Sequence, residues 1–300
     1  MLFLYSAYGM QISSEISLPE LCISNRSGEQ ADLNIRYGSI SKDSLERPKQ
    51  IGPFIWVTDN DLLFEVPSVA RFLISSGRQI LVDPVSGIDE DSVRVFLLGS
   101  AFGAALLQRG LLVLHGNGIE INGKCLICVG PSGIGKSTLT AAFLQRGHRI
   151  LADDVVPLDS GGMAIPGFPR IKLWQDVAEK MDIDTKQLSR IRPELQKFNL
   201  PLKDSFCETP SPVVRICVLS EHQSNSVEVI RVSGIEKFQL LQSNTYRSRF
   251  MAGLSLQKNH LSQCSTLARN VSMIKVARPM VGFQIDRLVD AILNDFYEGI

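Results

Sequence analysis

One stretch of the chain combines the residue types that can hold a nucleoside triphosphate. Residues 130–137 read Gly-Pro-Ser-Gly-Ile-Gly-Lys-Ser, fit the Walker A pattern G-x-x-x-x-G-K-[ST] in full, and follow an apolar run. Glycines let backbone N–H groups converge on phosphate oxygens without obstruction by Cβ, and the helix after such a loop presents its positive end to the same anions. The sequence therefore predicts a P-loop that binds ATP together with Mg²⁺.

Each position in this loop has an expected task. Lys136 should reach the β- and γ-phosphates, and the hydroxyl of Ser137 should hold Mg²⁺. The alternative is a glycine turn before an ordinary helix, with Lys136 merely solvated, but the intact motif between a strand pattern and a helix pattern favours nucleotide binding. The predicted cofactor-binding residues are Gly130, Pro131, Ser132, Gly133, Ile134, Gly135, Lys136, Ser137 and Thr138.

Two adjacent carboxylates follow the next apolar run. Asp153 and Asp154 come 17 and 18 residues after Lys136, which predicts that they end a strand adjoining the loop. Mg²⁺ takes one or two carboxylates along with phosphate oxygens and water, so one aspartate suffices for the metal. The other is free to position a hydroxyl and accept its proton. A pair of aspartates that only caps a turn is the alternative.

A histidine precedes the loop. His115 ends an apolar run 21 residues before Lys136. It could couple to the aspartates and tune proton transfer near neutral pH, because histidine titrates there. It could equally be a core histidine bonded to backbone, and the sequence leaves both interpretations open.

The elements that must position these residues form an α/β (α+β) fold. Residues 1–90 predict a mainly antiparallel β region, and residues 91–300 a P-loop core. In the core, a helix over 89–107 precedes strands at 111–114, 118–121 and 124–129, and the Asn122-Gly123 pair predicts a hairpin turn. A helix over 136–146 and a strand over 149–152 follow the loop. The remaining predicted strands are 2–8, 32–36, 54–57, 62–66, 71–75, 79–82, 213–219 and 227–232, and the remaining helices are 235–241 and 286–297.

The amino-acid composition limits the classes of partner that we expect for this chain. The 300 residues carry 31 basic and 31 acidic side chains, so there is no general field to attract nucleic acid or an anionic membrane. The most apolar stretch, 95–107, is too short for the roughly 20 residues of a bilayer crossing. The N-terminus does not resemble a secretory signal, and the six scattered cysteines indicate reduced thiols. We therefore expect a cytoplasmic protein with neither nucleic-acid nor membrane partners.

The chain resembles the HPr kinase/phosphorylase and ATP-dependent phosphoenolpyruvate carboxykinase superfamily. The resemblance is carried by Leu114-His115-Gly116, by the P-loop, and by the run from Gly147 to Asp154, over about residues 111–158. It implies that Asp153 is the base toward a serine hydroxyl, that Asp154 is a Mg²⁺ partner, and that His115 joins the catalytic cluster. It also makes Arg170 and Lys172 candidates for binding phosphate or acceptor, although basic residues are more often simply exposed.

The resemblance also narrows the expected substrate. The chain lacks the Glu-Val-Arg-Gly-type run that HPr kinases carry downstream, and its opening, with Tyr8-Gly9 and residues 16–21, is instead similar to HPr-kinase-like proteins of lasso-peptide clusters. This implies a serine kinase for a peptide or small protein, with the C-terminal serine of a precursor peptide as the specific case. A metabolite kinase, a carboxykinase-like enzyme and a non-catalytic nucleotide-binding regulator are the alternatives. HPr kinases form hexamers, so homo-oligomerisation is expected by analogy.

Overall fold

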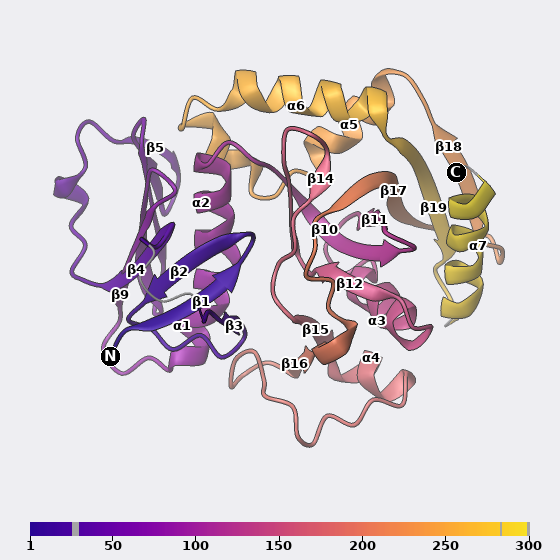
Figure 1. The fold of residues 1–300 in the computed structure, drawn as a ribbon, viewed down its shortest axis with the longest axis horizontal. Coiled ribbons are helices and arrows are strands. Elements are labelled where there is room, and N and C mark those ends of the chain that lie inside the picture. The colour runs from indigo at the N-terminus through magenta and orange to yellow at the C-terminus, as the bar shows by residue number, and fades with distance from the viewer. Residues whose placement is uncertain (26–29, 283, 299–300) are drawn as a thin grey trace.

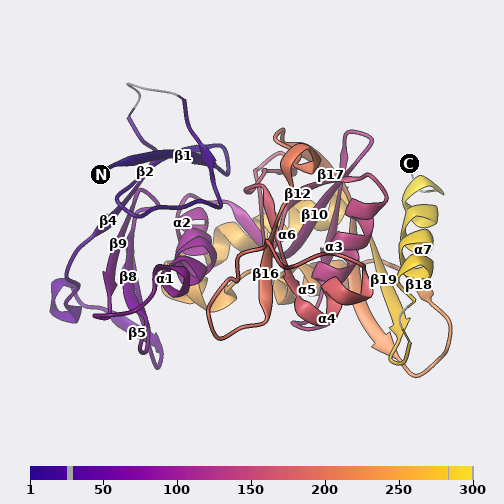
Figure 2. The same cartoon turned by 90° about the horizontal axis from the view of Figure 1, so that it is seen from below.

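A computed structural model describes residues 1–25, 30–282 and 284–298, and its mixture of strands and helices confirms the predicted α/β class. The N-terminal strands lie to one side, the remaining strands lie to the other, and helix α2 (Phe102–Gln108) runs between them (Figures 1 and 2). Over the described residues, no helix combines the length and hydrophobicity that a bilayer crossing requires.

The N-terminal sheet is largely antiparallel, as predicted. Its strand order over the described residues is β3-β1-β2-β4-β9-β8-β7-β6-β5, and only the β2–β4 and β4–β9 pairings are parallel. The sequence interpretation missed the short strands β2, β3 and β5. The strands are β1 (Phe3–Ala7), β2 (Met10–Ser14), β3 (Cys22–Ile23), β4 (Leu33–Tyr37), β5 (Lys49–Gly52), β6 (Ile55–Val57), β7 (Asp61–Val66), β8 (Ala70–Ser75) and β9 (Gln79–Pro84).

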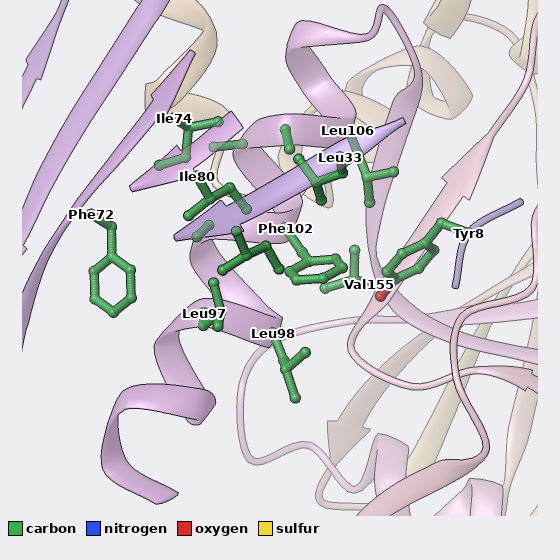
Figure 3. Packing of buried hydrophobic residues seen from close by; sticks show 14 of the residues in the cluster. Tyr8, Leu33, Phe72, Ile74, Ile80, Leu97, Leu98, Phe102, Leu106 and Val155 are labelled. Atoms are coloured by element: carbon green, nitrogen blue, oxygen red, sulfur yellow. The ribbon is translucent and has the colours of Figure 1, made fainter. Parts of the chain in front are cut away.

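A helical segment covers this sheet. It begins at α1 (Glu90–Phe96), where the side chain of Asp89 accepts a hydrogen bond from the backbone N–H of Ser92, as expected for a helix cap. The predicted single helix is in fact interrupted by one π-helical stretch, η2 (Leu97–Ala101), before α2. Figure 3 shows Leu97, Phe102 and Leu106 packed among sheet residues. Each such buried side chain contributes about 1.5–3 kcal/mol, so this face fixes the helix on the sheet.

The second large sheet surrounds the P-loop. Its order is β11-β10-β13-β14-β17-β19-β18, and β17 pairs in parallel with β11 as well, so five of its strands close on themselves. The predicted strands at 111–114 and 118–121 are one continuous strand, β10. The strands are β10 (Leu112–Ile121), β11 (Lys124–Val129), β12 (Arg149–Ala152), β13 (Val155–Leu158), β14 (Met163–Ala164), β17 (Ser211–His222), β18 (Glu228–Val232) and β19 (Ser272–Pro279).

Helices and a small two-stranded sheet complete this part. Asn122 and Gly123 have φ values of 52° and 78°, which confirms the predicted tight turn between β10 and β11. The two-stranded sheet of β15 and β16 stands apart from both large sheets. The remaining elements are α3 (Lys136–Gln145), β15 (Arg170–Trp174), α4 (Gln175–Lys180), β16 (Lys197–Pro201), α5 (Ile235–Ser243), α6 (Gln257–Asn270) and α7 (Ile285–Glu298).

The expected position of the aspartate-bearing strand was wrong in one respect. Strand β12 does not adjoin the P-loop strand β11, because β10 lies between them and pairs antiparallel with both. Two strands that are each antiparallel to β10 run in the same direction. Their carboxyl ends therefore meet at one edge of the sheet, and this common edge brings the loop and the aspartates together.

A single hydrophobic cluster connects the two parts of the chain. It joins residues of the N-terminal sheet, such as Leu33, to Phe102 of the helical segment and Val155 of β13 (Figure 3). The division into regions 1–90 and 91–300 stays a prediction.

Candidate active site

The P-loop runs from the end of β11 to the start of α3. Gly130 has a φ of 146°, and a Cβ at this position would lie 2.8 Å from the backbone oxygen of Leu219. Gly135 precedes α3 with a φ of 104°, and no side chain caps the helix there. Glycine is required at the first position by the close approach of β17, and the uncapped helix leaves its N-terminal amides for a ligand.

The ammonium group of Lys136 folds back over its own loop. Its Nζ donates to the carbonyl oxygens of Gly130, at 2.8 Å, and Pro131, at 3.0 Å. Burial lowers the pKa of Lys136, and the charges of Asp154 and Asp153 oppose that effect. Lys136 is therefore a buried cation within the electrostatic reach of both aspartates.

Asp153 is held by two donors below the surface of the cavity. Its Oδ1 accepts from the Asn117 amide at 2.8 Å, and its Oδ2 accepts from the backbone N–H of Lys172 at 2.9 Å. The Asn117 amide also donates to Thr140 of α3 at 2.6 Å. Both Asp153 oxygens are thus oriented by strands β10 and β15.

Asp154 turns away from its neighbour. Its φ of 67° lies in the left-handed region, which Asp tolerates better than most residues. Its carboxylate forms an ion pair with the ammonium group of Lys172 and lines the cavity. One lysine therefore engages both aspartates, Asp153 through its backbone and Asp154 through its side chain.

These surroundings give the two carboxyl groups different pKa values. Burial, followed by the charge of Asp154, raises the pKa of Asp153 to about 6. Burial acts in the same direction on Asp154, but the charge and hydrogen bond of Lys172 outweigh it and hold the pKa of Asp154 below its usual range. Asp154 is ionised at neutral pH, whereas the pKa of Asp153 lies in the range that suits a proton acceptor.

The His115 ring contacts the aspartate pair through the backbone carbonyl group of Asp154. Its Nδ1 lies 3.1 Å from the carbonyl oxygen of Asp154, so Nδ1 carries the proton and Nε2 is the free acceptor. Burial, followed by the charge of Lys136, lowers the pKa of His115, which is therefore neutral at pH 7. The ring is thus bonded to backbone, as one interpretation of the sequence expected, and it also lines the cavity, while its part in proton transfer stays a prediction.

One cavity of about 1100 Å³ unites most of the predicted site residues. Its walls include His115, Asp154, Lys172 and eight of the nine predicted P-loop residues. The exception is Ile134, which packs into the core beneath the loop. The eight are Gly130, Pro131, Ser132, Gly133, Gly135, Lys136, Ser137 and Thr138.

Arg170 lies outside the cavity, next to Glu20 of the N-terminal region. Its guanidinium group contacts the Asn199 amide oxygen at 2.5 Å and the Glu20 carboxylate at 3.7 Å, and it is not among the residues that line the cavity. Of the two basic residues proposed for phosphate or acceptor, Lys172 faces the cavity and Arg170 joins the N-terminal region instead.

The sequence interpretation also omitted several residues of the site. Asn117 orients Asp153, and Arg278 of β19 donates to the carbonyl oxygen of Ile134 at 3.2 Å, which supports the loop from behind. No local motif marks these positions, because each reaches the site through a distant pairing. Further residues that the sequence interpretation omitted line the cavity, among them Gly99, Ser100, Trp174, Lys197, Tyr246 and Arg247.

Ser137 and Asp154 are suitable ligands for Mg²⁺. A hydroxyl and an ionised carboxylate on one wall are the hard oxygen donors that this cation prefers, with the remainder coming from phosphate and water. The glycine cradle and the uncapped α3 terminus likewise suit a polyphosphate.

Comparison with known proteins shows which family this part of the chain is similar to. The family model described as the HPr serine kinase C-terminal domain matches residues 110–167, which include His115, the P-loop and both aspartates. This segment is HPr-kinase-like. The match confirms the predicted resemblance over about 111–158.

Similar proteins include HPr kinase/phosphorylases. One from Clostridium botulinum (strain Eklund 17B) is 33% identical over 91 residues, and these cover 30% of each chain. Another from Clostridium novyi is 24% identical over 180 residues, covering 53% of this chain and 56% of the relative. The matched part of this chain thus spans less than a third of the botulinum relative. The solved HPr(Ser) kinase/phosphatase of Coxiella burnetii matches with 15% identity and a TM-score of 0.29, over 62% of this chain and 95% of that one.

Proposed function

We propose that this chain is an ATP- and Mg²⁺-dependent kinase that phosphorylates a serine hydroxyl of a peptide or small protein. The observation that carries the proposal is the shared sheet edge, where the P-loop and Asp154 line one cavity and Asp153, the preceding residue along the chain, lies below its surface. A volume of about 1100 Å³ exceeds the roughly 300–1,000 Å³ of a typical single-ligand pocket, which leaves room for an acceptor beside the nucleotide.

Each residue of the site has a proposed role that follows from its surroundings. The loop amides and Lys136 would bind the phosphates, and Ser137 with Asp154 would hold Mg²⁺. Asp153 would accept the proton of the acceptor hydroxyl, because Asn117 and the Lys172 N–H hold its oxygens in place and its pKa is raised. Bound Mg-ATP supplies the phosphoryl group.

A more specific substrate follows from the N-terminal resemblance alone. We propose the C-terminal serine of a lasso-type precursor peptide as the acceptor. The opening residues that carry this resemblance include Tyr8, which is buried against Phe168 next to β15, so they lie close to the site rather than on a remote surface. Homo-oligomerisation and a cytoplasmic location remain further proposals.

Two measurements test the proposal. Calorimetry should detect Mg²⁺-dependent binding of ATP by the natural chain and little binding by Lys136→Met. Labelled ATP should then be offered with a peptide ending in serine, the same peptide ending in alanine, HPr and a set of metabolites. We expect label in the serine peptide and none in its alanine control.

Each other outcome has a distinct meaning. Label in a metabolite alone would support a metabolite kinase or a carboxykinase-like enzyme. Binding without consumption of ATP, with every acceptor tried, would support a nucleotide-binding regulator. Absence of Mg²⁺-dependent nucleotide binding would contradict the proposed function as a whole.

A further inference from the structure

Lys197 enters the nucleotide cavity from a strand that carries no motif. Strand β16 pairs antiparallel with β15, and this register places Lys197 opposite Trp174. The Lys197 ammonium lies 5.2 Å from the centre of the Trp174 ring, and both residues line the cavity. Because a lysine near an aromatic face is held by cation–π attraction, the ring fixes this ammonium at the cavity wall.

Three lysines line this cavity, and two of them already have partners. Lys172 is paired with Asp154, and Lys136 donates to two carbonyl oxygens of its own loop. The ammonium group of Lys197 has no ion pair or hydrogen bond within the part of the chain that the structure describes, and its aromatic contact is with Trp174. Among the three lysines of the cavity, Lys197 is therefore the one without an anionic or hydrogen-bonding partner for its ammonium group in the described residues.

The surroundings of Lys197 indicate where its anion would lie. Burial, followed by the charge of Lys172, lowers its pKa, and both aspartates oppose the shift. Lys197 in turn acts on the pKa of Lys136 and of Asp153. It thus lies within electrostatic reach of Lys136, which is proposed to bind phosphate, and of Asp153, which is proposed to accept the proton.

We infer that Lys197 binds the terminal phosphoryl group of the nucleotide, opposite the P-loop, and this inference rests on the proposed function. A partly buried ammonium without a counter-ion is unfavourable, and an anionic ligand removes that cost. Lysine binds phosphate as a point charge, so one such contact suffices. The loop amides and Lys136 would hold the phosphates, and Lys197 would add a further cation, from strand β16, for the terminal group.

The test compares two nucleotides by calorimetry. Mg-ADP and the Mg complex of the non-hydrolysable β,γ-imido analogue of ATP are titrated into the natural chain, Lys197→Met, Lys197→Arg and the exposed-site control Lys186→Met. We expect Lys197→Met to weaken binding of the analogue about tenfold, as for loss of one charged hydrogen bond, and to leave ADP binding unchanged. Lys197→Arg should recover most of the loss, and Lys186→Met should match the natural chain.

The remaining outcomes are decisive. Equal weakening of both nucleotides, or weakening of neither, overturns the inference. A raised KM for the acceptor with unchanged analogue binding assigns Lys197 to the acceptor, which also overturns it. Failure of the natural chain to bind either nucleotide contradicts the proposed function itself. Circular dichroism of each variant establishes that the fold is retained.

Discussion

Adjacent aspartates acquire different environments because Asp154 adopts a left-handed backbone conformation between β12 and β13, two strands that run in the same direction along β10. The positive φ of Asp154 sends its carboxylate to the Lys172 ammonium, while Asp153 points back toward Asn117 and the Lys172 N–H. Two carboxylates with a shared direction would repel each other and compete for one counter-ion. Here each has its own donors, so one can remain a charged ligand while the other exchanges a proton.

Substitution of Asp153 by Asn tests this division. The amide NH₂ cannot accept a proton, and it must face either the Asn117 amide or the Lys172 N–H, which are both donors. We expect phosphoryl transfer to fall by about 10²–10⁴-fold, as for loss of a positioned base. Binding of Mg-ADP should change little, because the loop is untouched.

The control for this prediction is Asp182→Asn, which changes an exposed aspartate whose φ of 53° suits either residue. Transfer and nucleotide affinity are measured with labelled ATP and by calorimetry. Full transfer by Asp153→Asn would remove Asp153 from the proposed mechanism.

At the scale of elements, the helical segment α1–η2–α2 forms one wall of the cavity. Gly99 and Ser100 of the π-helical stretch line the cavity, and Tyr246 lies against the same segment. The Tyr246 ring also lies beside the His115 ring, with the ring centres 5.7 Å apart and the ring planes tilted by 51°. The helix that covers the N-terminal sheet therefore also positions an aromatic side chain beside the site.

Two glycines of this segment provide a matched pair of variants. A Cβ at Gly103 would lie 2.5 Å from the Tyr246 ring, whereas a Cβ at Gly99 would meet only the Tyr246 hydroxyl, at 3.3 Å. Alanine is favoured over glycine by about 1 kcal/mol within a helix, and overpacking costs about 1–3 kcal/mol.

We expect Gly103→Ala to lower the free energy of unfolding by about 1–2 kcal/mol, because the overpacking exceeds the helix propensity gain. Gly99→Ala should be neutral or slightly stabilising. Urea unfolding followed by circular dichroism measures both. Equal stability of the two variants would mean that Tyr246 is not fixed against the helix.

At the scale of the whole molecule, a buried ion network joins the N-terminal region to the site. The Glu20 carboxylate contacts Arg94 of α1 at 3.1 Å and Arg170 of β15 at 3.7 Å, and all three side chains are largely buried. Strand β15 also carries Lys172, whose N–H and ammonium hold the two aspartates. The N-terminal region thus stabilises the strand that organises the reaction centre.

Glu20→Gln should therefore affect both stability and transfer. Removal of one partner of a buried ion pair costs about 3–5 kcal/mol of stability. We expect a loss near the lower limit of this range, because Arg94 retains its ion pair with Asp91 and Arg170 retains its hydrogen bond to Asn199. Transfer should fall while Mg-ADP binding is retained, because the P-loop lies outside the network. Urea unfolding, labelled ATP and calorimetry provide the three measurements.

Glu65→Gln is the matched control, since Glu65 pairs with Lys42 and Arg71 on the N-terminal sheet, where all three side chains are more exposed. Salt bridges at such positions contribute only about 0–1 kcal/mol. A Glu20 variant that behaved like this control would show that the two regions are energetically independent.

The sequence by itself determined the local parts of the site. The P-loop, the hairpin before it and the strand that ends at Asp153 were predicted because each depends on neighbouring residues: glycines with positive φ, an Asn-Gly turn, an apolar run. The same holds for most strands of the N-terminal sheet.

Only the tertiary structure decided which distant elements meet. It inserted β10 between the loop strand and the aspartate strand, placed β17 in parallel beside β11, and brought Asn117 and Lys197 to the aspartates. Such pairings are selected by packing over the whole chain rather than by local propensity, because strand preferences depend on their neighbours. Lys197 is therefore an ordinary basic residue in the sequence, and only the fold places it on the cavity that the phosphate loop lines.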